Sequence, residues 1–142
     1  MELRPLTEDY AVSPQIEPQD LAAIRQAGFT MIIDNRPDAE IPPELWAERM
    51  RAAAEAEGLT FVVNPVVGGA ITMDNVTAQA DAIASSKGPV LAYCASGNRS
   101  SIVWALSQAG RMPTDELIAR AARWGYNLEP FRQTIESLAN RG

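Results

Sequence analysis

The chain has 142 residues, of which 46% are hydrophobic, and a formal net charge of −6, which are the values of one ordinary folded domain. The acidic balance argues against nucleic acid as a partner, because such binding requires many basic groups. No apolar stretch approaches the ~20 residues of a membrane span, and the N-terminus lacks the apolar core of a signal peptide. We therefore expect a soluble, cytoplasmic protein with no membrane partner.

The residue counts also restrict the chemistry. The sequence has no histidine, which excludes Ser/His/Asp and Cys/His catalysis and His-ligated zinc. Its single cysteine, Cys94, excludes an intramolecular disulfide, a CxxC redox pair and a cysteine zinc cluster. We expect neither a metal nor a cofactor, so any reaction must use one thiol, hydroxyls, carboxylates, basic side chains or backbone dipoles.

Short apolar runs predict strands at residues 29–33, 59–63 and 89–93, with a weaker candidate at residues 10–12. The three strong runs are hydrophobic almost throughout, as in parallel strands that are covered on both faces. They begin about 30 residues apart, the length of a βαβ unit. The pattern predicts a mostly parallel sheet.

Helical periodicity fills the intervals between these strands. We expect helices from about Pro18 to Gly28, between Pro42 and Gly58, and from an N-cap at Thr72 to Gly88. Three further helices follow the last strong strand, and their apolar faces contain Ile102, Val103 and Leu106, then Leu117, Ile118, Ala121 and Ala122, then Leu128, Phe131, Ile135 and Leu138. Alternating strands and helices without a linker predict a single α/β domain over residues 1–142.

Three tryptophans, Trp46, Trp104 and Trp124, fall on these helical patterns, and we expect them in the core.

The turn after the third strong strand contains the most distinctive residues of the chain. It reads Cys94-Ala95-Ser96-Gly97-Asn98-Arg99-Ser100, and a helix is expected to begin around Arg99. Ligands of open α/β sheets bind at the carboxyl ends of strands, where a helix N-terminus offers free N–H groups and a partial positive charge. The residues Ala95, Ser96, Gly97, Asn98, Arg99 and Ser100 are therefore expected to bind an anion with their backbone N–H groups.

Cys94 is expected to be the catalytic nucleophile at the base of this turn, with Arg99 as the second catalytic residue. A thiol beside a helix N-terminus and a guanidinium ionises more readily than a free thiol. Arg99 offers two parallel donors to an oxyanion, and the Ser100 hydroxyl is a candidate donor to the sulfur. Without this context, a lone cysteine after Val-Leu-Ala-Tyr would be interpreted as a small buried apolar residue. The Gly turn and the arginine favour the functional interpretation.

The Cys-(x)4-Arg-Ser pattern after a strand resembles the active loop of cysteine-dependent phosphatases and of rhodaneses. The wider sequence is similar to the phosphatase-like domain family of beta-lactamase-hydrolase-like proteins, whose members are also described as sulfur transferases. This resemblance rests on residues 12–16, 33–38, 88–94 and 96–100 and on the Gly125-Tyr126 pair. It implies a three-layer phosphatase-like fold with a four-stranded parallel sheet flanked by helices.

Two features bear on whether phosphorus or sulfur is transferred. Four residues separate Cys94 from Arg99, as in rhodaneses, whereas tyrosine and dual-specificity phosphatases have five. The stretch that supplies the general acid of dual-specificity phosphatases corresponds to residues 64–71, which contain no carboxylate. Phosphoryl transfer benefits from protonation of the leaving group, whereas sulfite or a thiolate leaves without it. The sequence therefore favours a sulfurtransferase that moves a sulfane sulfur from thiosulfate or a persulfide through a Cys94 persulfide.

A tyrosine or dual-specificity-type phosphatase that works through a Cys94 phosphocysteine is the alternative enzyme. Its acid would have to come from Asp34, Asp38, Glu40 or Asp74, and Arg36 is a further candidate to reach the anion. A third interpretation is an anion-binding module without turnover, since Ala95 stands where relatives often carry arginine. The partner is in each case a small sulfur donor or acceptor, or a phosphorylated substrate.

Overall fold

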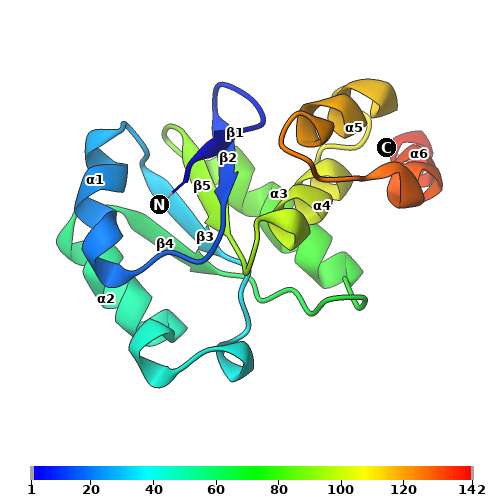
Figure 1. Ribbon diagram of the computed structural model, residues 1–142. Helices are drawn as coiled ribbons and strands as arrows, with labels where there is room; N and C mark the ends of the chain where they lie inside the picture. The colour runs from blue at the N-terminus through cyan, green and yellow to red at the C-terminus, as the bar shows by residue number, and fades with distance from the viewer. Residues whose placement is uncertain (1, 142) are drawn as a thin grey trace.

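The computed structural model describes residues 2–141, and a five-stranded sheet lies at their centre (Figure 1). The strands have the order β1-β2-β5-β3-β4, and their bounds are Arg4–Pro5 for β1, Tyr10–Ser13 for β2, Met31–Asp34 for β3, Thr60–Val63 for β4 and Val90–Tyr93 for β5. The last four are parallel, whereas β1 is antiparallel to β2. The predicted α/β class is confirmed, and all four predicted strands form.

The predicted mostly parallel sheet is confirmed, and the four parallel strands that the resemblance implies are joined by one further strand, β1. β1 pairs through only two residues, Arg4 with Val12 and Pro5 with Ala11. Such a short segment has no alternation that could reveal it, and Pro5 argues against a strand except at an edge, where β1 lies. A tight turn, in which the N–H groups of Leu6 and Thr7 donate to the Tyr10 carbonyl oxygen, folds β1 back onto β2.

Helices cover both faces of the sheet and form the two outer layers (Figure 1). Their bounds are Leu21–Gln26 for α1, Ala47–Ala56 for α2, Met73–Ser85 for α3, Asn98–Ser107 for α4, Thr114–Ala122 for α5 and Arg132–Arg141 for α6. α1 and α2 lie on one face and α3 and α4 on the other, with α5 and α6 packed outside α4. None of the helices within residues 2–141 is long and apolar enough to cross a membrane.

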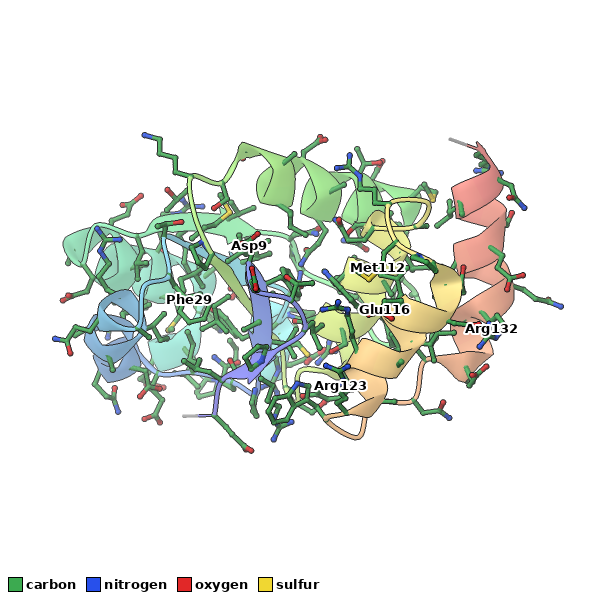
Figure 2. All side chains as sticks on the ribbon, turned by 90° about the horizontal axis from the view of Figure 1, so that it is seen from above. Asp9, Phe29, Met112, Glu116, Arg123 and Arg132 are labelled. Atoms are coloured by element: carbon green, nitrogen blue, oxygen red, sulfur yellow. The ribbon has the colours of Figure 1, made fainter. Side chains whose placement is uncertain are left out.

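The helix boundaries follow the local signals in the sequence. Thr72 caps α3 through its hydroxyl, which accepts a hydrogen bond from the Asn75 N–H group, as predicted. At the outer side of the molecule, Arg132 lies at the start of α6 (Figure 2). Its guanidinium contacts the Asp115 carboxylate of α5 at 2.6 Å. This ion pair connects the two C-terminal helices.

Each face of the sheet has its own apolar core. Ile32, Leu91 and Tyr93 pack against α1 and α2, whereas Ile33 and Ala92 pack on the side of α3 to α6. The expectation for tryptophan is confirmed only for Trp104, which is 1% exposed.

The other two tryptophans lie at the surface, where Trp46 is 39% and Trp124 is 41% exposed. Each indole N–H group donates to a backbone carbonyl oxygen, Trp46 to Ile41 and Trp124 to Pro5. Both residues stand at helix ends, where the helical period no longer determines which way a side chain faces.

The register of the sheet brings the carboxyl ends of the parallel strands together. Tyr93 of β5 lies beside Ser13 of β2 on one side and Asp34 of β3 on the other, and Asp34 lies beside Val63 of β4. The segments that follow these four strands therefore meet at one edge of the sheet. The Cys94 turn, which follows β5, lies between the segments that follow β2 and β3.

Candidate active site

The Cys94 turn runs from the end of β5 directly into α4. Gly97 stands at the N-cap of α4 with φ 94° and ψ −8°, the left-handed conformation that favours glycine. Helix α4 begins at Asn98, one residue before the predicted start. Eight of its ten residues are buried, so the helix N-terminus is held firmly at the edge of the sheet.

The side chain of Cys94 faces this turn. The residue has no exposed surface, yet its Sγ atom accepts a hydrogen bond from the Gly97 N–H group at 3.1 Å. A packed apolar cysteine would point away from the turn's amides. The sulfur instead lies within hydrogen-bond distance of a backbone N–H group, at the N-terminus of α4, where the helix dipole is positive.

The carbonyl oxygens of the turn accept hydrogen bonds from groups outside it. Gln15 donates its N–H to the Ala95 oxygen at 3.3 Å, and the Tyr126 hydroxyl donates to the Ser96 oxygen at 2.7 Å. The Gly97 oxygen accepts from the hydroxyl of Ser101 in α4 at 2.8 Å. Because these peptide units are fixed by their oxygens, the direction of their N–H groups is fixed as well. Ala95 and Ser96 are exposed and Asn98 is partly buried, so the turn opens to solvent on one side.

Arg99 lies in the first turn of α4 and is held at two points. Its Nη1 atom donates to the Val66 carbonyl oxygen at 2.7 Å, and its guanidinium forms a two-point ion pair with Glu40, with Nη1–Oε2 at 2.9 Å and Nη2–Oε1 at 2.8 Å. The hydrogen bond that Arg99 donates to Glu40 raises the pKa of Arg99, and interaction with the Cys94 sulfur raises it further. The guanidinium therefore stays charged beside the thiol.

Glu40 is the carboxylate that the fold brings to this site. It also accepts a hydrogen bond from Arg36 Nε at 2.9 Å, so it lies between two arginines. The hydrogen bond from Arg99 lowers the pKa of Glu40, and the one from Arg36 adds to the effect. Glu40 is therefore ionised at neutral pH and has no proton to give. The sequence offered Glu40 only as one of four candidate acids, and its pairing with Arg99 carried no local signal.

The remaining candidates occupy other positions. Asp38 accepts a hydrogen bond from the Ala47 N–H group at 2.8 Å at the start of α2, and Asp74 is exposed in the first turn of α3. Asp34 is 1% exposed, and its Oδ1 atom accepts from the Arg36 N–H group at 2.8 Å. Burial raises the pKa of Asp34 to about 6. Arg36 contacts Glu40 and Gln15 at the rim of the site.

Ser100 is buried and its hydroxyl points away from the thiol. The hydroxyl donates to Asn35 Oδ1 at 2.8 Å, so the expected donation to Cys94 is not what the structure shows. Asn35 in turn donates to the Asn64 carbonyl oxygen at 2.9 Å and to Gln79 Oε1 at 3.0 Å. Ser100 thereby joins α4 to the ends of β3 and β4. This buried amide network was not predicted, because its members are far apart in the sequence.

A cleft of about 450 Å³ opens beside Arg99. Its walls come from the segment after β4, from α4 and from the C-terminal segment, and they include Gly68, Ile71, Ile102 and Phe131. The cleft is thus mainly apolar, with Arg99 among its lining residues.

The sequence profile of the family described as "Beta-lactamase hydrolase-like protein, phosphatase-like domain" matches residues 2–111, which include all the strands and the whole Cys94 turn. The chain belongs to this family. A beta-lactamase hydrolase-like protein of Xylella fastidiosa (strain Temecula1) is 35% identical over 130 residues, which are 90% of this chain and 30% of that protein. The chain thus spans about 30% of the length of this relative.

Solved structures of phosphatase-like proteins have the same fold as this family member. The crystal structure of a candidate phosphatase from Neisseria meningitidis is 36% identical with a TM-score of 0.82, over 97% of this chain and 99% of that one. TpbA of P. aeruginosa, solved in complex with pTyr, has a TM-score of 0.69 at 12% identity, over 98% of this chain and 88% of its own. The phosphatase-like fold implied by the resemblance is confirmed.

Proposed function

We propose that this chain is a cysteine-dependent phosphatase that hydrolyses phosphate monoesters through a phosphocysteine at Cys94. The observation that carries the proposal is the position of the Cys94 sulfur, which accepts the Gly97 N–H at the N-terminus of α4 with Arg99 beside it. This arrangement stabilises both the anionic sulfur and an oxyanion that approaches it. The 36% identity of this chain to a candidate phosphatase favours phosphorus over sulfur, in contrast to the expectation from the four-residue spacing and the missing acid in segment 64–71.

The first step is an attack of the Cys94 thiolate on phosphorus. The S–P bond forms as the bond between phosphorus and the ester oxygen breaks, and that oxygen leaves as an alkoxide or phenoxide. Arg99 and backbone N–H groups of the Cys94 turn other than that of Gly97, which donates to the sulfur, bind the non-bridging oxygens and balance their charge during transfer. Water then attacks the phosphocysteine, inorganic phosphate departs and the thiolate is restored.

Neither segment 64–71 nor Glu40 offers a proton to a poor leaving group. The segment 64–71 contacts Arg99 through the Val66 carbonyl oxygen but contains no carboxylate, and Glu40 is held in its ionised form. The substrates that suit this site are therefore esters whose oxygen leaves readily as an anion, above all aryl phosphates. The apolar cleft beside Arg99 offers room for an aromatic group.

Hydrolysis of a series of aryl phosphates tests this function. We expect activity that rises steeply as the phenol becomes more acidic, that vanadate inhibits, and that Cys94→Ser abolishes. Arg99→Lys should reduce kcat/KM about 100-fold or more, because one ammonium cannot replace the planar two-point donor. Glu44→Gln, in the surface turn before α2, is the control for a remote charge change. Hydrolysis that survives Cys94→Ser would overturn the proposal.

A sulfurtransferase remains the second candidate, favoured by the four-residue spacing and by the missing acid in segment 64–71. A Cys94 thiolate would attack the outer sulfur of thiosulfate, form a persulfide and expel sulfite. After incubation with thiosulfate or glutathione persulfide, intact-protein mass spectrometry would then show a gain of about 32 Da, absent in Cys94→Ser. Aryl phosphatase activity without any such adduct would exclude this candidate.

A further inference from the structure

The peptide unit between Ser96 and Gly97 is bound at both of its ends. Its N–H group donates to Cys94 Sγ at 3.1 Å, and its carbonyl oxygen accepts from the Tyr126 hydroxyl at 2.7 Å. The Tyr126 oxygen itself accepts from Arg4 Nη1 at 2.6 Å, and the same Nη1 lies 3.4 Å from the Ser96 oxygen. A chain of hydrogen bonds therefore runs from a cation on β1 to the sulfur.

Hydrogen bonds of this kind strengthen one another. A donor at the carbonyl oxygen withdraws electron density from the peptide, which makes its N–H group more positive and a better donor. Tyr126 is only 6% exposed, so little water is present to replace its hydroxyl. The Arg4 guanidinium also lies over the Tyr126 ring, 5.7 Å from its centroid, and this contact holds the two side chains together.

The absence of a side chain at Gly97 allows the Tyr126 hydroxyl to lie against the turn. A Cβ atom added to Gly97 would overlap the Tyr126 hydroxyl, and the left-handed φ of 94° itself favours glycine. The Tyr126 hydroxyl therefore occupies the space that a side chain at position 97 would need. Tyr126 follows α5 and Arg4 belongs to β1, so segments from opposite ends of the chain meet on the outer side of the turn.

We infer that Tyr126 and Arg4 are positioning residues, which stabilise the Cys94 thiolate by orienting and polarising the Ser96–Gly97 peptide without touching the substrate. The inference rests on the proposed role of Cys94 as the nucleophile. Neither residue contacts the sulfur in this chain of hydrogen bonds, and their effect passes through one backbone N–H group.

Other ionisable groups act on the same sulfur and must be kept constant in a test. Tyr10 of β2 and Arg99 of α4 interact with Cys94 electrostatically, Glu40 acts through its pairing with Arg99, and Glu2 forms an ion pair with Arg4. Tyr126→Phe removes one hydroxyl and leaves the ring and these other groups in place. Arg4→Met removes the cation and keeps most of the side-chain length.

Trp124→Phe is the matched control. Its indole N–H group donates to the Pro5 carbonyl oxygen at 2.7 Å, so it connects the same end of α5 to the same strand β1. It makes this connection without a hydrogen bond to the Cys94 turn. A variant that only loosens the packing of β1 against α5 will therefore behave like Trp124→Phe, whereas a loss of polarisation will be specific to Tyr126 and Arg4.

The test is the rate of Cys94 alkylation by iodoacetamide between pH 4 and 10. The midpoint of this curve reports ionisation, whereas its plateau reports access to the thiol. The wild-type curve gives the reference midpoint against which the variants are compared. Tyr126→Phe and Arg4→Met should raise the midpoint by about half a pH unit to one unit and lower kcat/KM for aryl phosphates about 3- to 10-fold. Trp124→Phe should do neither.

The two possible failures differ in their outcome. A low wild-type midpoint that neither Tyr126→Phe nor Arg4→Met shifts would overturn the role of the two positioning residues and leave the phosphatase proposal intact. A wild-type midpoint near about 8.5 would overturn both, because there would be no stabilised thiolate to explain. Equal shifts in all three variants would also overturn the inference, since they would reflect packing alone.

Discussion

Glu40 and Arg99 are joined by two hydrogen bonds, although they lie 59 positions apart in the sequence. The Glu40 carboxylate occupies two donors of the Arg99 guanidinium in a planar two-point geometry. An oxyanion substrate would use the same geometry. An incoming phosphate must therefore share Arg99 with Glu40 or displace it. The remaining anchor of Arg99, the Val66 carbonyl oxygen, is independent of this exchange.

Glu40→Gln should strengthen anion binding. The substitution removes the competing charge and keeps the size of the side chain. Because Glu40 is about one-third exposed, its charge is partly screened, and we expect the inhibition constant of inorganic phosphate to fall only about 3- to 10-fold. Inhibition of aryl phosphate hydrolysis measures this constant. Glu44→Gln is the control, and an unchanged or higher constant in Glu40→Gln would mean that Glu40 orients Arg99 for the substrate.

Asp34 should make the folded state less stable as the pH rises. Burial raises the pKa of this carboxyl group to about 6, above its value of 3.8 in an unfolded chain. The folded state therefore binds the proton more tightly, and this contribution is complete below pH 3.8 and is lost as the pH rises through about 6. The shift corresponds to roughly 3 kcal/mol at most.

Asp34→Asn tests this dependence, because asparagine has nearly the same shape and does not ionise. We expect the variant to exceed the wild type in free energy of unfolding at pH 7.5 by about 1 to 3 kcal/mol, and to lose this advantage at pH 4. Urea unfolding at both pH values provides the comparison, with Asp81→Asn on the exposed side of α3 as the control. A difference that does not depend on pH would contradict the assignment.

Gly97→Ala should disrupt the turn. A methyl group there requires a rare left-handed conformation and overlaps the Tyr126 hydroxyl, so the turn or Tyr126 must move. We expect aryl phosphate hydrolysis to fall about 100-fold or more, since displacement by about 1 Å has this effect on positioned groups. Gly28→Ala is the matched control, because Gly28 also has a positive φ, 103°, but faces open space before β3, at the opposite edge of the sheet from the site. It should cost about 1 kcal/mol of stability and leave hydrolysis within about twofold. Equal loss of activity in both variants would show that the contact with Tyr126 is unimportant.

Asn35→Ala should destabilise the fold through the network behind the site. The substitution leaves the Ser100 hydroxyl, the Gln79 side chain and the Asn64 carbonyl oxygen without their Asn35 partner in a buried environment. We expect a loss of about 2 to 4 kcal/mol in the free energy of unfolding, measured by urea titration. Asn127→Ala, at an exposed position, should lose less than about 1 kcal/mol. Similar losses in the two variants would contradict the importance of the network.

Much of this architecture could be predicted from local sequence. Continuous apolar runs determine the buried strands β3 and β5, and the cap at Thr72 marks the start of α3. These features depend on neighbouring residues, because hydrophobic period and capping act over one or two turns. The run of β4 also forms a strand, but it lies at the sheet edge with only Phe61 buried, so the expected cover on both faces is absent there. The edge strand β1 was not predicted, because it depends on a partner strand and not on a local pattern. Its two residues are held by pairing with β2 and have little preference of their own.

The sequence by itself determined the chemical components of the site: one thiol, a glycine turn and an arginine in the first turn of a helix. Only the tertiary structure decided what surrounds them. Glu40 faces Arg99, Ser100 bonds to Asn35 and Tyr126 contacts Ser96 because the strand register and the packing of the C-terminal helices bring these distant segments to one edge of the sheet. The physical reason is that a local pattern specifies backbone conformation, whereas a contact between distant side chains depends on the summed packing of the whole chain.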